Sequence, residues 1–296
     1  MFSLAQTASY ADNLRSTHNV SFCWKTRDFY LSPEDAEHLT NRRLQLMGTS
    51  TSSLEVYEEE LKGELVVVKR FRHDEQHDPS VEDIKVALDK WKQVSFHPNI
   101  APFLGLCSDA SMPLPMLLTP RACWNLLQYV QTHPDAPKRA LIYSIAAALE
   151  YMHGQDVPIT HGNVKAENVL IDRNGVAYLS DIGIFQAVTH RGQLNQMEEL
   201  RWSAPEKVIY QEEHTSACDT WSFAMTIIEM HTGLSPFAYY QSLERVVIAI
   251  NIGEIPSRPS DMTDDRLWNL VEECLKYAPF SRPSMKWVAE SLSLSR

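Results

Sequence analysis

The spacing of apolar residues changes near residues 120–124, and this change constrains the fold more than any other feature of the sequence. Before it, short runs rich in β-branched and apolar residues predict strands near residues 56–57, 65–71, 101–107 and 115–119. Residues 80–94 have apolar side chains at helical spacing and predict one amphipathic helix. After it, helical spacing predominates, at residues 138–153, 220–232, 243–252, 265–277 and 285–292. The sequence therefore predicts an α+β fold, in which a small sheet-rich lobe precedes a larger, mainly helical lobe.

The charge balance excludes two classes of partner. The 296 residues include 27 Lys and Arg against 38 Asp and Glu, a formal net charge of −11 at pH 7. Nucleic acids and anionic membranes are both bound through basic surfaces, so neither is an expected partner. The length suffices to bury a core without disulfides or a structural metal.

Cysteine usage and the start of the chain indicate a compartment. The five cysteines are widely spaced, odd in number and include no Cys-x-x-Cys pair, which favours free thiols over a zinc site or a disulfide framework. The first residues lack the basic start and apolar run of a signal peptide, and no apolar run is long enough for a transmembrane helix. A cytoplasmic protein is expected.

Polar motifs follow one another in a fixed order through the second half of the chain. They are HGNVKAENVLI at residues 161–171, SDIG at 180–183, APE at 204–206, CDTWSFA at 218–224 and SRP at 281–283. Lys69 precedes them on a predicted strand. In these motifs and their order the chain resembles the protein kinase family over residues 44–293. HPNI at residues 97–100, followed by PFLGLC, is most similar to the tyrosine kinase-like group of that family.

The resemblance implies a bilobal protein-kinase-like fold, with a small antiparallel β lobe that carries one helix and a larger, mainly α lobe. It also implies ATP and Mg²⁺ as cofactors. It implies an N-lobe at residues 44–121 and a C-lobe at 122–293, preceded by an N-terminal extension over residues 1–43. Phosphoryl transfer needs a lysine on the phosphates, oxygen ligands for Mg²⁺ and a carboxylate near the attacking hydroxyl. By their place in the motifs, Lys69 is the expected phosphate ligand, and Asn168 and Asp181 are the expected metal ligands. The other expected nucleotide contacts are Gly48, Val56, Val67, Thr119, Pro120, Ala122 and Leu170.

The catalytic loop departs from the family pattern. Asn163 stands where the family has its catalytic aspartate, and an amide cannot accept the proton of a substrate hydroxyl. Gly162 replaces the arginine that pairs with a phosphorylated activation loop in many kinases, so such phosphorylation should matter less here. Lys165 matches the catalytic-loop lysine of serine/threonine kinases, which approaches the γ-phosphate. The resemblance thus implies an intact lysine beside a degenerate base.

The nucleotide side departs as well. The phosphate-covering loop has Gly48 where the family has up to three glycines, which permit close backbone approach to phosphate. The glutamate that pairs with the strand lysine is expected at Leu88 or Ala87, and neither is acidic. Asp83, one turn earlier, is the candidate substitute. Val67 adds methyl groups where the adenine would rest.

Other motif residues are expected to be structural. Glu206 and Arg282 match an ion pair that anchors the helical lobe, Asp219 matches the acid that braces the catalytic loop, and His161 matches a scaffold histidine.

Several functions remain open at this point. The first is a pseudokinase or weak kinase, and the second is an active protein serine/threonine kinase. The third is a small-molecule phosphotransferase, which the APE and CDTWSFA motifs and Arg282 oppose. The fourth is a binding module without kinase function. The expected partners are a protein substrate or a regulated partner kinase, with the chain as a monomer or in a regulatory heteromer.

Overall fold

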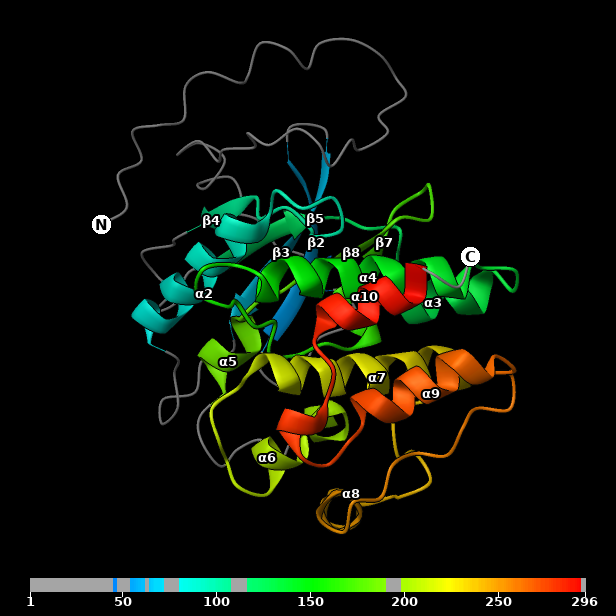
Figure 1. The fold of residues 1–296 in the computed structure, drawn as a ribbon. Coiled ribbons are helices and arrows are strands. Elements are labelled where there is room, and N and C mark those ends of the chain that lie inside the picture. The colour runs from blue at the N-terminus through cyan, green and yellow to red at the C-terminus, as the bar shows by residue number, and fades with distance from the viewer. Residues whose placement is uncertain are drawn as a thin grey trace. The chain divides into compact units, whose positions relative to one another are not determined.

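The structure, a computed structural model, describes residues 45–46, 54–61, 64–71, 80–107, 116–189 and 198–293 (Figure 1). The predicted extension over residues 1–43 and Gly48 lie outside the described residues. The chain forms two compact units, which we describe separately. The first spans Met1–Val81 and Ala101–Arg121, and the second spans Glu82–Ile100 and Ala122–Arg296.

The described strands of the first unit form a five-stranded antiparallel sheet in the order β1-β2-β3-β5-β4. The strands are β1 (Gln45–Leu46), β2 (Leu54–Leu61), β3 (Glu64–Phe71), β4 (Gly105–Cys107) and β5 (Met116–Pro120). Val66 and Val68 of β3 and Leu117 and Leu118 of β5 are fully buried. This arrangement confirms the predicted antiparallel β region.

The predicted strand at residues 101–107 is shorter in the structure. Only residues 105–107 form β4. Pro102 has no N–H to donate to a strand ladder, which accounts for the irregular chain before β4. The N–H of Leu104 already donates to the carbonyl of Leu118 at 3.2 Å, so the chain joins the sheet just before β4.

The predicted amphipathic helix is α2 (Val81–Val94), and it packs within the second unit. Its apolar face, which includes Ala87, Leu88 and Trp91, is buried. A Cβ added at Gly183 would lie 3.3 Å from the Cβ of Ala87, so α2 passes close to the SDIG segment. The positions where the family pattern expects a glutamate are therefore filled by apolar core residues. The division of the chain into an N-lobe and a C-lobe at residue 121 stays a prediction.

The second unit is mainly helical and includes a short sheet. Its remaining α-helices are α3 (Leu126–Thr132), α4 (Lys138–His153), α5 (Ile184–Val188), α6 (Pro205–Val208), α7 (Ser216–Thr232), α8 (Leu243–Asn251), α9 (Asp265–Cys274) and α10 (Met285–Ser293). Single 3₁₀ turns lie at η1 (Ala166–Asn168), η3 (Glu198–Trp202) and η4 (Pro279–Ser281). The described strands β6 (Trp124–Asn125), β7 (Val169–Ile171) and β8 (Ala177–Leu179) form an antiparallel sheet in this order.

Helix α7 is the core of the second unit. Every residue from Cys218 to Met230 is buried, and α4 and α9 pack against the helix (Figure 1). The predicted helices are confirmed with small changes at their ends. Helix α9 ends at Cys274, before residue 277, and Pro279, which has no N–H and disfavours helix in the residue before it, follows closely. The guanidinium of Arg282 then binds the carbonyls of Lys276 (2.8 Å) and Tyr277 (2.9 Å).

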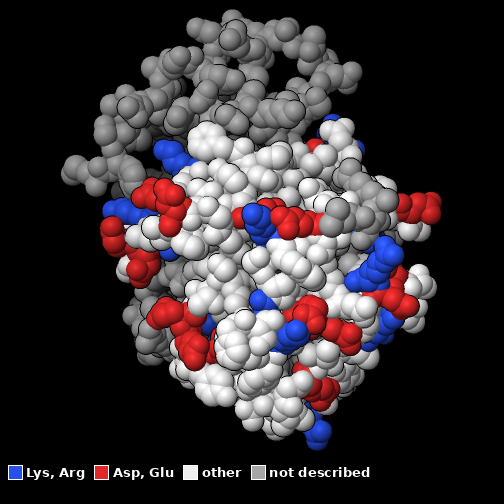
Figure 2. Space-filling model, viewed as in Figure 1, with Lys and Arg blue, Asp and Glu red and all other residues white. Residues whose placement is uncertain are grey.

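Surface and thiol features complete the description. On the face shown in Figure 2, acidic and basic side chains lie in small mixed groups separated by uncharged surface. None of the helices in the described ranges has both the length and the apolar character to cross a membrane. Cys123, Cys218 and Cys274 are free thiols, of which Cys123 is partly exposed and the other two are buried.

Candidate active site

Four of the expected nucleotide contacts share one face of the sheet in the first unit. Lys69 on β3 lies opposite Val56 on β2, and Val67 lies opposite Thr119 on β5. Directly opposed residues point to the same face, as do residues two apart on a strand. Pro120 lies opposite Val66 and belongs to the other face. The strand register therefore brings a lysine and three side chains of the predicted nucleotide site together.

These four side chains differ in exposure. Val67 is 8 % exposed and Thr119 is 1 % exposed, whereas Val56 and Lys69 are half-buried. Asp83 lies on α2 in the second unit, so its predicted pairing with Lys69 stays a prediction. Contact of these residues with a nucleotide is likewise a prediction.

The β7–β8 hairpin of the second unit places the expected metal ligands at one end. Asn168 directly precedes β7, Asp181 follows β8, and the strands pair in the register Val169 opposite Leu179. The N–H and Oγ of Ser180 donate to the carbonyl of Asn168 at 3.0 and 3.2 Å. Asp181 is buried and has a positive φ of 62°, a conformation that aspartate tolerates better than most residues.

The donor set suits a hard cation. The side-chain amide of Asn168 donates from Nδ2 to the carbonyl of Asn163 at 2.8 Å, which leaves Oδ1 for another partner. Mg²⁺ prefers oxygen ligands and is usually held by one or two side chains together with substrate phosphates. Asn168 and Asp181 fit this pattern. Leu170, the expected apolar contact of the adenine, is half-buried on β7 between its neighbours on β6 and β8.

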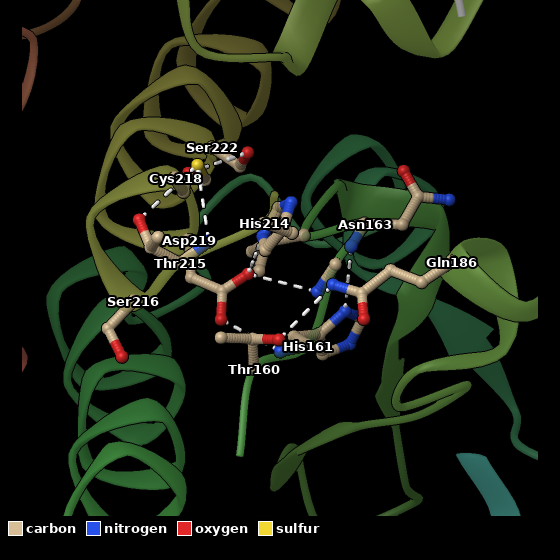
Figure 3. A network of polar contacts seen from close by, with 12 residues as sticks. Thr160, His161, Asn163, Gln186, His214, Thr215, Ser216, Cys218, Asp219 and Ser222 are labelled. Atoms are coloured by element: carbon tan, nitrogen blue, oxygen red, sulfur yellow. Dashed lines mark hydrogen bonds and ion pairs between the residues drawn. The ribbon is translucent and has the colours of Figure 1, made fainter. Parts of the chain in front are cut away.

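The side chain of Asp219 on α7 holds the catalytic loop through hydrogen bonds to the backbone of that loop (Figure 3). Its carboxylate is fully buried and accepts the N–H of His161 at 2.7 Å and the N–H of Gly162 at 3.0 Å. Nε2 of His153 and Nε2 of His214 lie 2.9 and 2.8 Å from the same carboxylate. The predicted brace is confirmed.

The two histidines explain why the buried carboxylate of Asp219 is ionised. Burial by itself raises the pKa of Asp219, but His214 and His153 outweigh it and hold that pKa below its usual range. Sequence reasoning missed both histidines. His214 could have been found, since it lies five residues before Asp219, but nothing in the sequence links His153 to it.

Asn163 lies in the loop that Asp219 fixes. Its N–H donates to Nδ1 of His161 at 3.2 Å, and its carbonyl accepts from Asn168. Its side-chain amide makes no hydrogen bond to any residue that the structure describes. Burial lowers the pKa of His161, which keeps that imidazole neutral and structural, as expected.

Lys165 has partners that the sequence analysis did not identify. Its Nζ lies 2.7 Å from Oε2 of Glu167 and 3.2 Å from Oε1 of Glu199, and it sits 5.8 Å from the ring centroid of Trp202. Burial would lower the pKa of Lys165, but the two carboxylates reverse this and raise it. Glu199 lies five residues before the APE motif. Its acidic side chain was the sign in the sequence that it could pair with the catalytic-loop lysine. The predicted approach of Lys165 to a γ-phosphate stays a prediction.

Gly162 is enclosed by a neighbouring side chain. It has φ +87°, and a Cβ built on it would lie 2.5 Å from Nε2 of Gln186. That amide, on α5, donates to Oγ1 of Thr160 at 3.2 Å (Figure 3). The space where an arginine would begin is therefore filled, which gives a structural reason for the glycine.

The predicted anchor of the helical unit is present. Arg282 donates to both carboxylate oxygens of Glu206, at 2.6 and 2.7 Å, and both side chains are buried. The Sγ of Cys218 lies 3.2 Å from the same carboxylate. This ion pair fixes α6 to the segment before α10.

Comparison with known proteins agrees with this geometry. The family model for protein tyrosine and serine/threonine kinases matches residues 47–292. "Mitogen-activated protein kinase kinase kinase 1b" of Physcomitrium patens is 30% identical over 190 residues, 64% of this chain and 24% of that protein. "Mitogen-activated protein kinase kinase kinase ANP1" of Arabidopsis thaliana is 28% identical over 236 residues, 75% of this chain and 34% of that protein. The chain thus matches about a quarter to a third of the length of these relatives. Family model, motifs and fold agree, and the chain belongs to the protein tyrosine and serine/threonine kinase family.

Proposed function

We propose that this kinase domain binds ATP with Mg²⁺ but transfers phosphate slowly or not at all, and that it acts in signalling as a pseudokinase or weak kinase. The observation that carries the proposal is Asn163. It occupies the position of the catalytic base in a loop that Asp219 holds by two backbone hydrogen bonds. An amide can orient a hydroxyl but cannot take its proton. Loss of a positioned base costs about 10²–10⁴-fold in rate.

Retained nucleotide binding is supported by each unit on its own. In the first unit, Lys69 offers a cation, and Val56 and Val67 on the same face of the sheet offer apolar surface. In the second unit, Asn168 and Asp181 lie at one end of the β7–β8 hairpin. Bound Mg²⁺ would neutralise phosphate charge there. From the family pattern we also propose contacts to Gly48, Thr119, Pro120, Ala122 and Leu170.

Nucleotide binding is tested by thermal unfolding with and without MgATP. Binding to the folded state raises the melting temperature by mass action. We expect a rise at millimolar MgATP in the wild type and a smaller rise in Asp181→Ala. An unchanged melting temperature in the wild type would refute this part of the proposal.

Impaired catalysis is tested by phosphate transfer from labelled ATP. The wild type should transfer little, and Asn163→Asp should transfer more because it restores a carboxylate at the base position. Asn163→Ala is the matched control, since it removes the amide without adding a base. Rapid transfer by the wild type that Asp181→Ala abolishes would overturn the pseudokinase assignment.

The second candidate is an active protein serine/threonine kinase, and the retained pair Asn168 and Asp181 favours it. A small-molecule phosphotransferase is less well supported, because α6 and the Glu206–Arg282 pair belong to the pattern of protein kinases. We propose a protein substrate or a regulated partner kinase as the partner, with the chain as a monomer or in a regulatory heteromer. A cytoplasmic location is part of the same proposal.

A further inference from the structure

We propose that Lys165 is a structural clamp that joins the catalytic loop to the end of the activation segment, residues 181–206, and is not a phosphate ligand. Glu199 is a positioning residue, because its ion pair with Lys165 holds the lysine against the end of the activation segment. The nucleotide part of the inference rests on the proposed function, whereas the clamp itself rests on contacts within the second unit.

The hydrogen-bonding capacity of Lys165 is already used. An ammonium group has three N–H donors and no acceptor. Glu167 and Glu199 take donors at 2.7 and 3.2 Å, and the group also faces the ring of Trp202 within cation–π distance. The Lys165 side chain is only 8 % exposed. A phosphate oxygen would therefore have to displace a partner that is present.

The local charge opposes a phosphate as well. One lysine between two carboxylates leaves an excess of one negative charge, which repels an anion. If Lys165 moved away, Glu199, which is 9 % exposed, would remain as a buried charge without its cation. Breaking a buried pair in this way is strongly destabilising.

The same cluster ties three elements together. Lys165 precedes η1, Glu199 and Trp202 belong to η3, and Glu229 lies on α7. Oε2 of Glu229 accepts the N–H of Ala166 at 2.9 Å and Nε1–H of Trp202 at 2.8 Å. Loop, segment end and core helix are thus joined by ion pairs and hydrogen bonds.

A neighbouring contact strengthens the same connection. Arg201, between Glu199 and Trp202, donates to the carbonyls of Phe237 (3.0 Å) and Tyr240 (3.2 Å). The end of the activation segment is therefore held by side chains encoded in the sequence. A loop that carries Gly162 in place of an arginine has no guanidinium of its own for a phosphorylated segment, and the clamp supplies the connection instead.

The test combines melting temperature with MgATP affinity in Lys165→Met, Glu199→Gln and the double variant. Lys165→Met leaves two carboxylates without their cation and should lower the melting temperature by roughly 5–15 °C. Glu199→Gln keeps the Lys165–Glu167 pair and should cost less. The double variant should melt higher than Lys165→Met alone, because the buried carboxylate has been removed. Lys165→Arg, which keeps the charge, is the variant to use if Lys165→Met does not fold, and it should melt close to the wild type.

Affinity for MgATP separates a clamp from a phosphate ligand. Lys165→Met should change the Kd for MgATP by less than about twofold, whereas Lys69→Met, the matched lysine control, should raise it about tenfold or more. A tenfold rise in Lys165→Met with an unchanged melting temperature would overturn the clamp. If the wild type binds no MgATP, the proposed function fails on that point, and the rescue of Lys165→Met by Glu199→Gln still decides the clamp.

Discussion

At the residue scale, Glu229 shows how burial changes a single carboxyl group. Its side chain is 6 % exposed, and burial raises the pKa of Glu229 from 4.5 to about 7, even though the N–H groups of Ala166 and Trp202 lower it. Because the folded pKa exceeds the unfolded one, the folded state binds more protons between these values. The contribution of Glu229 to stability is therefore greatest below about pH 4.5 and falls as the pH rises towards 7.

Glu229→Gln should remove this dependence. The amide oxygen can accept the same two hydrogen bonds without a charge, so the variant should be more stable than the wild type at pH 8, by up to about 3 kcal/mol. At pH 5 the two proteins should be similar. Urea unfolding at both pH values measures the difference. Equal stability at pH 8 would contradict the assignment.

Gly162 is the second residue with a specific prediction. A side chain at φ +87° is strained, and here its Cβ would also meet Gln186. Gly162→Ala should lower the free energy of unfolding by about 1–3 kcal/mol. In a Gln186→Ala background the same change should cost less, because only the backbone strain remains. Denaturant unfolding of the four proteins in this cycle measures both contributions, and equal costs in both backgrounds would show that Gln186 plays no part.

At the scale of elements, Asp219 joins α4, the catalytic loop and α7 through one carboxylate. Its pKa is held below the usual value, so its contribution to stability is present above about pH 3.8 and is lost as the pH falls below that value. Asp219→Asn should lower the free energy of unfolding at pH 7 by about 3–5 kcal/mol.

A buried aspartate with local contacts provides the control for this variant. Within the described ranges, the Asp172 carboxylate is bound only by residues of its own hairpin, at positions 174, 176 and 178. Asp172→Asn should cost clearly less than Asp219→Asn in thermal or denaturant unfolding at pH 7. Similar losses in the two variants would mean that the link between elements is not what makes Asp219 important.

The helices also show which parts of the fold could be predicted from the sequence. Helix α4 was predicted at its observed bounds because its apolar residues recur at helical spacing. The end of α9 was predicted at residue 277, three residues too late, because apolar residues continue through Leu275 and Tyr277 beyond the last helical residue, Cys274. Apolar spacing predicts where an element forms, whereas its last residue also depends on features such as Pro279, which disfavours helix in the residue before it.

At the scale of the whole molecule, the family followed from the order of the motifs and the fold class from apolar spacing together with them, and the matched family model confirms both. The contacts inside the candidate site were less accessible. The Asp219 brace was predicted, whereas His153, Glu199 and Gln186 were not, since each reaches its partner only after the chain has folded. Helix α2 falls in the second unit, and its buried face includes Ala87 and Leu88 where the family pattern suggested an acid.

Cys123 is a site for selective chemical modification. The thiols of Cys218 and Cys274 are buried, and burial raises the pKa of Cys218 to about 12, so both should resist alkylation. Cys123 is partly exposed and follows Ala122, a proposed adenine contact. Maleimide should therefore modify Cys123 before the two buried thiols, and MgATP should slow the reaction, as peptide mapping by mass spectrometry would show with Cys123→Ser as the control. An electrophile attached to an adenine-like scaffold would then bind this kinase domain covalently through a position that its phosphate chemistry does not use.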